Sequence, residues 1–559
     1  MSNKLRSNFE EGSTRWAVRR AQWIAMGIAE SDFAKPKIAV INSSSGLSVC
    51  YQHLDEFSKL TQDAIREAGG LPFEINTIAP SDFVTSAGKK ARYLMPTRDL
   101  MVNDIEVMME GAVLDGMILL SSCDKTTPAH LMAAARLNIP ALVIPCGYQL
   151  GGNCHGKQVD IEEVYKGVGT LLMGKMNVAD MEEWTRCAIK GPGVCAGMAT
   201  ANSMHCLAEA LGMALSGTTP IRAAGDKLRE VVRQAGQQII SLVEKDIRPR
   251  DILTIKAFEN AIRVAISIGC SVNTVRHLSA IAVEAGLDID VVAIFEQEAA
   301  QLSQITQIRP NGPDRIEDLD RAGGTRAVLF QLRHLLNETV MTVNGQLLST
   351  LLKEEIVIDD KIIRPTDKPF RPEPGLTIIR GNLAPSGAIV KLSGIGTGNR
   401  IFEGPARVFN DEDLAMMALS EGRINDGDIV ILRMMGPVGG PGTVFACSFM
   451  AALSGAGKGA TVAVVTDGEL SGLNKGITIG QVMPEAACGG PLAIVEEGDL
   501  IRIDLHARKI DLQINPDLYA QRMEQWQPPV RTLENNWLKI YAENVMPIEK
   551  GAVLGKRGG

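Results

Sequence analysis

The sequence of 559 residues lacks features that would place it in several common classes of protein. It has no basic block and a net charge of −8, so nothing marks a surface for nucleic acid or an anionic membrane. No run reaches the roughly 18 apolar residues that a membrane-spanning helix needs. The first residues carry charges but no apolar core, so we expect no secretory signal. We therefore expect a soluble, cytoplasmic protein that acts on small molecules, with no nucleic-acid or membrane partner.

The ten cysteines lack the close CxxC spacing that marks many metal and redox sites. A reducing cytosol would keep scattered cysteines as thiols, so a disulfide framework is not expected. Most are expected to be small core residues, and a few are candidates for metal binding. The sequence also shows no internal repeat and no low-complexity tract.

At this length the chain should form two or more domains. The first two-thirds alternate strand-like and helix-like segments. Strands are expected at 37–42, 73–78, 114–120 and 141–145, and helices at 53–68, 129–137, 227–243 and 258–285. This alternation predicts an α/β domain, with a parallel sheet and flanking helices.

Beyond this part, four prolines between residues 364 and 375 mark a linker, because proline opposes regular structure. Short β-branched runs separated by glycine follow it, at 376–379, 389–392, 429–432, 461–465 and 500–505. They predict a β-rich barrel or sandwich. The expected divisions are an α/β domain at 1–363, the linker at 364–375, a β-rich domain at 376–517, and a C-terminal helix and arm at 518–559.

Cys50, Cys123 and Cys195 each lie in a loop that leads into a predicted helix. Ligand sites in open α/β sheets lie beyond the carboxyl ends of strands, so these thiolates could converge on one edge of the sheet. Cys146 also follows a strand, and packing cysteines remain the alternative. The other cysteines are interpreted as structural or incidental, namely Cys154, Cys187, Cys206, Cys270, Cys447 and Cys488.

The hexapeptide Cys123-Asp-Lys-Thr-Thr-Pro128 places a thiol, a carboxylate and an amine beside a predicted helix N-terminus. Burying Asp124 and Lys125 costs several kcal/mol unless they are paired or bind metal. A structural ion pair between these two residues is the alternative. Asp82, which follows another predicted strand, could join Asp124 at a hard cation such as Mg²⁺.

Five stretches of the sequence indicate a family more specifically than the amino-acid composition does. They are Cys123-Asp-Lys-Thr-Thr-Pro128, Val194-Cys-Ala-Gly-Met-Ala-Thr-Ala-Asn-Ser-Met204, Leu207-Ala-Glu-Ala-Leu-Gly212, Phe402-Glu-Gly-Pro-Ala-Arg-Val-Phe409 and Thr466-Asp-Gly-Glu-Leu-Ser-Gly472. In them the chain resembles the dihydroxy-acid dehydratase and sugar-acid (phosphogluconate, arabinonate) dehydratase family, and the resemblance covers nearly the whole length. It implies an α/β domain, a barrel-like C-terminal domain, an active site between them, and a homodimer or a dimer of dimers.

The resemblance also implies the cofactors and their ligands. It assigns three thiolates to an iron–sulfur cluster, namely Cys50, Cys123 and Cys195. A cysteine at position 50 favours a 2Fe–2S cluster over 4Fe–4S. It assigns three groups to Mg²⁺, namely Asp82, Asp124 and Lys125, the last as a carbamate. Ser471 would be the catalytic base.

The chemistry that the resemblance implies is a hydro-lyase reaction, from a 2,3-dihydroxy carboxylic acid to a 2-keto acid. Hydroxide is a poor leaving group, and a cluster held by three cysteines has an open iron that can act as a Lewis acid. Mg²⁺ would bind the substrate carboxylate and 2-hydroxyl. Ser471, as an alkoxide, would take the C2 proton.

The C-terminal half departs from the family pattern at five positions. Met435 stands where a glutamate is expected to bind Mg²⁺, and a thioether is a poor ligand for a hard cation. Glu469 stands where arginine is usual and Gln481 where histidine is usual. Thr443 and Phe445 stand where methionine and glutamate are usual. We expect Glu469 to return a carboxylate to the metal site.

Two other functions stay open. One is a sugar-acid dehydratase, which would convert an aldonate such as arabinonate, xylonate or gluconate to a 2-keto-3-deoxy acid. The other is a non-catalytic iron–sulfur sensor on the same scaffold. The presence of Ser471, Asp124 and Lys125 argues against a sensor, because a protein that only holds a cluster needs none of them.

Overall fold

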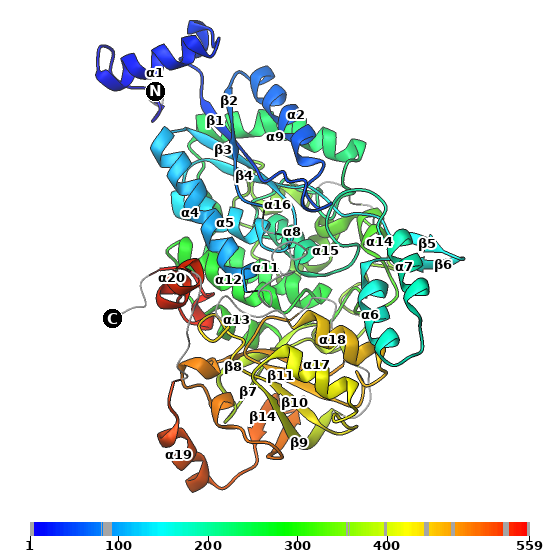
Figure 1. Ribbon diagram of the computed structural model, residues 1–559. Helices are drawn as coiled ribbons and strands as arrows, with labels where there is room; N and C mark the ends of the chain where they lie inside the picture. Colours follow the sequence, from blue (N-terminus) through cyan, green and yellow to red (C-terminus); the bar gives the residue numbers. More distant parts are fainter. Residues whose placement is uncertain are drawn as a thin grey trace.

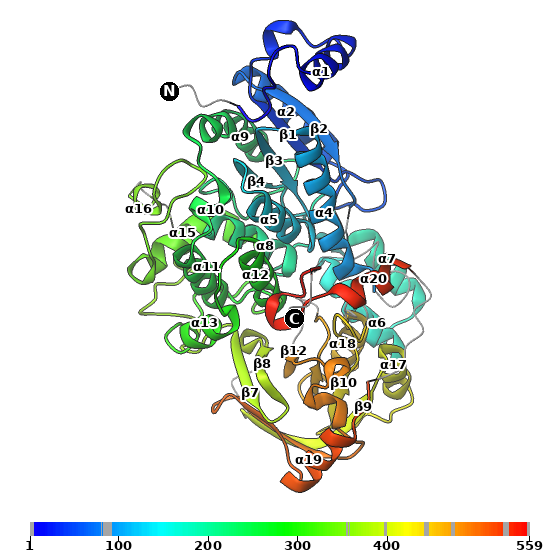
Figure 2. The same ribbon diagram turned by 90° about the vertical axis from the view of Figure 1, so that its left-hand side faces the viewer.

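The computed structural model describes residues 5–79, 81, 92–353, 356, 358–395, 400–440, 446–470, 476–528 and 536–555. An α/β half with many helices stands on a closed β-barrel (Figures 1 and 2), and this confirms the predicted fold class. Among the described residues, no helix has both the length and the apolar character that crossing a bilayer requires.

The N-terminal half is built on a four-stranded parallel sheet in the order β2-β1-β3-β4. Its strands are β1 (Lys37–Asn42), β2 (Leu71–Asn76), β3 (Gly116–Ser121) and β4 (Ala141–Pro145). Every residue of β1, β3 and β4 is buried, as expected where helices cover a parallel sheet. The covering helices are α2 (Leu54–Glu67), α4 (Leu94–Ala112), α5 (Thr126–Leu137) and α9 (Asp226–Lys245).

A second group of helices fills the space between the sheet and the barrel (Figure 2). It includes α8 (Thr200–Ala210), α11 (Ile255–Ile268) and α12 (Asn273–Glu284). The prediction of one helix over 258–285 was wrong. Gly269 adopts φ +66 and ends α11, because a left-handed residue at this position closes a helix. The chain then starts α12 at Asn273, close to the barrel.

The C-terminal half is a closed eight-stranded barrel in the order β10-β11-β12-β8-β7-β14-β13-β9. Its strands are β7 (Thr377–Gly381), β8 (Ala384–Val390), β9 (Ile401–Phe409), β10 (Ile429–Leu432), β11 (Ala463–Thr466), β12 (Thr478–Met483), β13 (Leu500–Asp504) and β14 (Lys509–Leu512). Side chains alternate along β10, where Ile429 and Ile431 fill the barrel and Val430 joins the larger core outside it.

The two halves are in close contact. Helix α6 (Ile161–Leu172) packs against α18 (Cys447–Gly455) of the barrel half. At Gly169 and Gly455 the two backbones approach so closely that a side chain at either position would clash. Strands β9, β10 and β11 are parallel, so the loops after β10 and β11 leave the same end of the barrel. The contact between Lys125 and Glu469 shows that this end faces the α/β half.

The remaining elements are peripheral or short. They are α1 (Thr14–Ala25), β5 (Gly152–Cys154), β6 (Lys157–Val159), α7 (Val178–Cys187), α10 (Pro249–Ile252), α13 (Val291–Glu298), α14 (Ile316–Arg321), α15 (Gly324–Leu332), α16 (Leu348–Leu351), α17 (Glu412–Ser420), α19 (Pro516–Gln525) and α20 (Asn536–Asn544).

Candidate active site

Cys50 and Cys123 lie on neighbouring loops, and Tyr51, the residue after Cys50, contacts Cys123. Cys50 is in the turn between β1 and α2, Cys123 follows β3, and the Ser122 hydroxyl donates to the Cys50 carbonyl at 2.7 Å. The Tyr51 side chain is hydrogen-bonded to Cys123 and to Thr126. Burial raises the pKa of Tyr51 well above its usual range, and ionised Cys123 and Cys50 would raise it further. Tyr51 therefore stays protonated, and its hydroxyl can donate a hydrogen bond to a thiolate.

The loop that carries Cys195 contacts the segment before Cys50. The Gly193 amide donates to the Val49 carbonyl at 3.4 Å, and Gly193 adopts φ +111. The Asn202 side chain donates to the Cys195 carbonyl at 2.7 Å and ties this loop to the start of α8. These contacts connect the three cysteine loops to one another. That their thiolates converge and together ligate a cluster stays a prediction.

The backbone of Cys123 is in an uncommon conformation. Its φ is +69, a left-handed value that few residues other than glycine adopt. Such strain persists only where the surrounding structure holds it, and it gathers at functional sites. Cys123 is buried, and the turn it makes directs the chain from β3 into α5.

Lys125 and Glu469 form an ion pair between the α/β half and the barrel half. Lys125 Nζ lies 2.7 Å from Glu469 Oε1, and both side chains are 0% exposed. Lys125 is thus paired with Glu469, a residue that the sequence placed at the metal site but did not pair with Lys125. The second carboxylate oxygen of Glu469 has no hydrogen-bond partner among the described residues. A buried carboxylate oxygen of this kind requires a ligand, a cation or water to satisfy it.

A second buried cation lies near this pair. Arg276 is 1% exposed on the first turn of α12; burial lowers the pKa of its guanidinium, and the charge of Glu469 offsets part of this effect. Burial and the charges of Lys125, Arg98 and Arg276 lower the pKa of the adjacent His277 well below its usual range, so this imidazole is neutral. Arg276 thus adds a second buried cation beside the Glu469 carboxylate.

Asn273 connects the helices to the barrel loop that precedes Ser471. Its side-chain amide donates to the Leu470 carbonyl at 2.9 Å and to Thr200 Oγ1 at 3.1 Å. Its oxygen accepts from the Gln481 side chain at 2.8 Å. Asn273 therefore holds the backbone beside the predicted base.

Met435 acts as a packing residue in this structure. Its side chain is 2% exposed in the main hydrophobic core, and its amide donates to Asp467 at 2.9 Å. Glu485 supports the same loop, because it accepts from the amides of Val438 and Gly439. Burial and the charge of Asp467 raise the pKa of Glu485 to about 7. The carboxylate paired with Lys125 therefore comes from Glu469 and not from position 435.

Several predicted positions lie outside the described residues, namely Asp82, Ser471, Thr443 and Phe445. Asp124 is 6% exposed and lies between the Cys123 turn and Lys125. Ser81 donates to Ser48, two residues before Cys50, at 3.3 Å.

The sequence analysis did not identify Tyr51, Asn273 or Arg276 as site residues. Arg276 stands in a helical segment that also contains polar residues, so its burial could not be predicted from its neighbours. The roles of Tyr51 and Asn273 depend on contacts with residues far away in the sequence, so no local pattern marks them.

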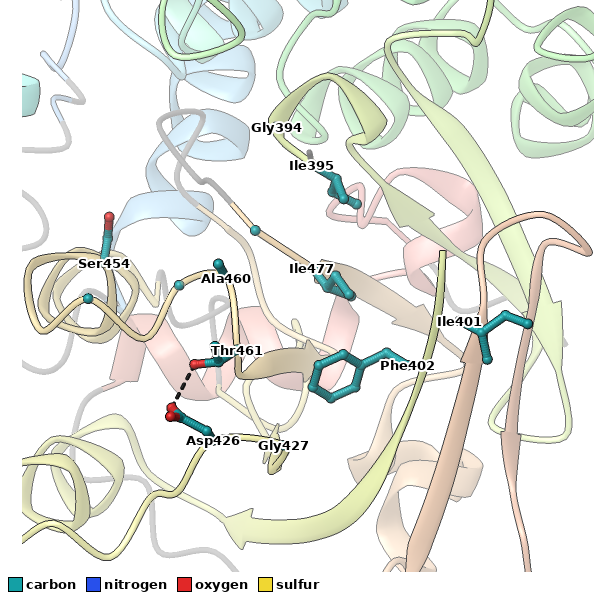
Figure 3. A pocket seen from close by; sticks show the side chains of 13 residues that line it. Gly394, Ile395, Ile401, Phe402, Asp426, Gly427, Ser454, Ala460, Thr461 and Ile477 are labelled. Carbon is teal, nitrogen blue, oxygen red and sulfur yellow. Dashed lines mark hydrogen bonds between the residues drawn. The ribbon is translucent and has the colours of Figure 1, made fainter. Parts of the chain in front are cut away.

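A hollow of about 880 Å³ lies at the other end of the barrel (Figure 3). It is lined by residues near the starts of β9, β11 and β12, whereas the Lys125–Glu469 pair is beyond the carboxyl end of β11. Asp426 accepts from the Thr461 hydroxyl at 2.7 Å in its wall. The hollow is therefore separate from the site described above.

Comparisons with known proteins identify the family of this chain. Residues 35–351 match the model of the dihydroxy-acid/6-phosphogluconate dehydratase N-terminal domain, and residues 361–552 match that of the C-terminal domain. Proteins called dihydroxy-acid dehydratase from Acetivibrio thermocellus and Pyrococcus furiosus are each 39% identical to this chain, over 98% of it and 100% of their own length. One of the same name from Methanothermobacter thermautotrophicus is 39% identical over 96% of this chain and 98% of its own. The chain therefore belongs to the dihydroxy-acid/6-phosphogluconate dehydratase family.

Proposed function

We propose that the chain is a hydro-lyase that removes water from a 2,3-dihydroxy carboxylic acid and releases a 2-keto acid. The observation that carries this proposal is the buried Lys125–Glu469 pair, which joins the two halves directly beyond the Cys123 turn. The relatives' names support a dihydroxy acid, and we do not favour an aldonate.

The donor set at the sheet edge fits an iron–sulfur cluster. Thiolates are the usual ligands of such clusters, and Cys50, Cys123 and Cys195 are carried by loops that hydrogen-bond to one another. The Tyr51 hydroxyl would stabilise a thiolate at Cys123 by donating to it. We propose a 2Fe–2S cluster here, as the resemblance to the family implies.

The residues beyond Cys123 fit Mg²⁺. Asp124 and the unpartnered oxygen of Glu469 are hard ligands. Asp82 and Lys125, the latter as a carbamate, complete the proposed set, and Glu469 replaces the carboxylate that is missing at Met435. When bound, the cluster and Mg²⁺ supply the Lewis acidity that helps the 3-hydroxyl to leave and makes the C2–H acidic.

The chain's own residues bind the acid and move its proton. The positive charge of Arg276 attracts the substrate carboxylate. We propose that Ser471 takes the proton from C2, while Asn273 holds the preceding carbonyl in place. The C3–O bond breaks, and the 3-hydroxyl leaves as water with the proton that Ser471 removed from C2. The resulting enol gives its hydroxyl proton to solvent, takes a proton from solvent at C3 and becomes the 2-keto acid.

A cytoplasmic location and a homodimer, or a dimer of dimers, also belong to this proposal. The test is anaerobic purification, followed by a keto-acid assay on 2,3-dihydroxyisovalerate and on a panel of aldonates. We expect turnover of dihydroxyisovalerate to exceed that of every aldonate. A preference for an aldonate would overturn the substrate assignment, and turnover of none of them would overturn the hydro-lyase.

A further inference from the structure

Four metal-binding side chains gather on a peripheral excursion of the α/β half. This excursion contains the β5–β6 hairpin and helices α6 and α7, at the right-hand edge of Figure 1. One ligand atom each from Cys154, His155 and Glu183 lies within 4.8 Å of the other two. The Cys187 thiol is hydrogen-bonded to Cys154 and adds a fourth group. None of these residues belongs to the candidate active site.

Two rigid elements present the four groups. Cys154, His155, Gly156 and Lys157 form a tight hairpin turn in which His155 has φ +50 and Gly156 φ +82. Two positive values of this kind are typical of the type I′ turn, which matches the twist of the flanking strands. Glu183 and Cys187 are four residues apart on α7 and therefore share a helix face.

The hairpin and α7 are held against each other by more than these groups. Gly152 approaches the Cys187 carbonyl so closely that a side chain there would clash. Lys157 lies over the Trp184 ring, with Nζ 4.4 Å from its centre. His155 Nε2 lies 2.5 Å from Glu183 Oε1, although both side chains are largely exposed. The positions of the ligands are thus set by the backbone and not by chance contact of flexible side chains.

We propose that Cys154, His155, Glu183 and Cys187 form a structural zinc site. Two thiolates, an imidazole and a carboxylate are a tetrahedral set that suits Zn²⁺. Bonds of about 2.0–2.3 Å place such ligands roughly 3.3–3.8 Å apart, so small rotations of these side chains would complete the site.

A divalent cation at this place would hold both cysteines as thiolates, because a coordinating thiol loses its proton. In a reducing cytosol the two cysteines would stay available as ligands and not form a disulfide.

The position of this site gives it a structural role. After α7 the chain returns toward Cys195, and Lys190 and Val194 form bridges with Leu150 and Tyr148. The zinc ion would join the β5–β6 hairpin to α7 at the outer end of the excursion. The inner end of the excursion leads into the Cys195 loop. It would also fix α6, which packs against α18 of the barrel half.

The test measures zinc and iron by mass spectrometry in the full-length, tag-free protein, purified without chelators. It compares the wild type with Cys154→Ser and Cys187→Ser, and with Cys488→Ser as the matched control, an exposed cysteine in the barrel half. We expect about one zinc per chain in the wild type and the control, and at least a tenfold loss in the two ligand variants. The iron content per chain should be equal in the wild type and the three variants.

A second measurement needs no variant. Native wild-type protein is alkylated with iodoacetamide before and after chelation, and the peptides with Cys187 and Cys488 are quantified. We expect chelation to raise labelling of Cys187 several-fold and to leave Cys488 unchanged. Substoichiometric zinc, equal zinc in all variants, or a disulfide between Cys154 and Cys187 in the native protein would each overturn the site.

Discussion

Lys125 Nζ and Glu469 Oε1 lie 2.7 Å apart, and neither side chain is exposed to solvent. One residue precedes helix α5 of the α/β half, and the other follows strand β11 of the barrel. A buried ion pair contributes little net stability but is costly to break, because the remaining charge is left without compensation. The pair therefore ties the two halves together at the point where the substrate is proposed to bind.

Replacing Glu469 should affect both stability and activity. In Glu469→Gln the buried Lys125 loses its carboxylate, and we expect the free energy of unfolding to fall by about 3–5 kcal/mol. Keto-acid formation should also become less responsive to added Mg²⁺. Urea unfolding and a Mg²⁺ titration of activity measure the two effects.

The double variant Lys125→Met/Glu469→Gln separates the effect on stability from the effect on activity. Removing both charges should restore much of the stability, while activity should stay lost. Glu421→Gln, an exposed carboxylate beside Arg423, is the control and should change neither quantity. Unchanged activity and Mg²⁺ dependence in Glu469→Gln would show that Glu469 does not replace the missing carboxylate.

The three cysteine loops make a prediction about iron content. Cys50→Ser, Cys123→Ser and Cys195→Ser should each reduce iron and acid-labile sulfide per chain to near background, because each removes a thiolate ligand. Cys146 is the matched control, since it also follows a strand and is fully buried. Its thiol donates to the Ile144 carbonyl, and Cys146→Ser should retain iron. If Cys146→Ser loses its iron while the other three variants retain theirs, the assignment of the three ligands is wrong.

Asn273 should act by positioning the loop before Ser471. In Asn273→Ala the Leu470 carbonyl loses its donor, and we expect kcat to fall about a hundredfold with a smaller change in KM. Iron content should not change. Asn260→Ala is the control, because Asn260 is equally buried on α11 and binds the backbone of Asn337 instead. If both variants lose the same stability and the same activity, Asn273 is only structural.

Glu485 predicts a pH dependence of stability. Its pKa is raised to about 7 in the folded chain, against about 4.3 when unfolded. Between these values the folded chain keeps a proton that the unfolded chain has released, so the free energy of unfolding should fall as the pH rises through this range. The full stabilising contribution of protonated Glu485 is present below about pH 4.3, the pKa of the unfolded chain.

Urea midpoints from pH 4.5 to 7.5, compared between the wild type and Glu485→Gln, test this dependence. The variant should show a shallower fall, because its amide does not titrate and so binds no proton in either state. Part of the slope should remain, since burial also raises the pKa of Glu412 to about 7. Identical slopes in the wild type and Glu485→Gln would contradict the raised pKa, and the control Glu421→Gln should follow the wild type.

The sequence by itself determined the elements that are buried on all sides. Strands β1, β4 and β10 begin and end as predicted, because a strand covered on both faces reads as an unbroken apolar run. Strand β9 was missed as a strand, although its residues were recognised as a family motif. It contains Gly404 and Pro405, which oppose strand formation locally. Gly404 is required because the Gly427 carbonyl approaches it too closely for a side chain.

The sequence also determined which loops could carry chemistry, since loops that follow parallel strands share one edge of the sheet. Only the tertiary structure decided the partners across that edge. Glu469 is 344 residues from Lys125, and Cys187 is 33 residues from Cys154. Periodicity and spacing report on neighbours within a few residues, whereas a buried charge or a metal ligand is satisfied by whatever the fold brings beside it.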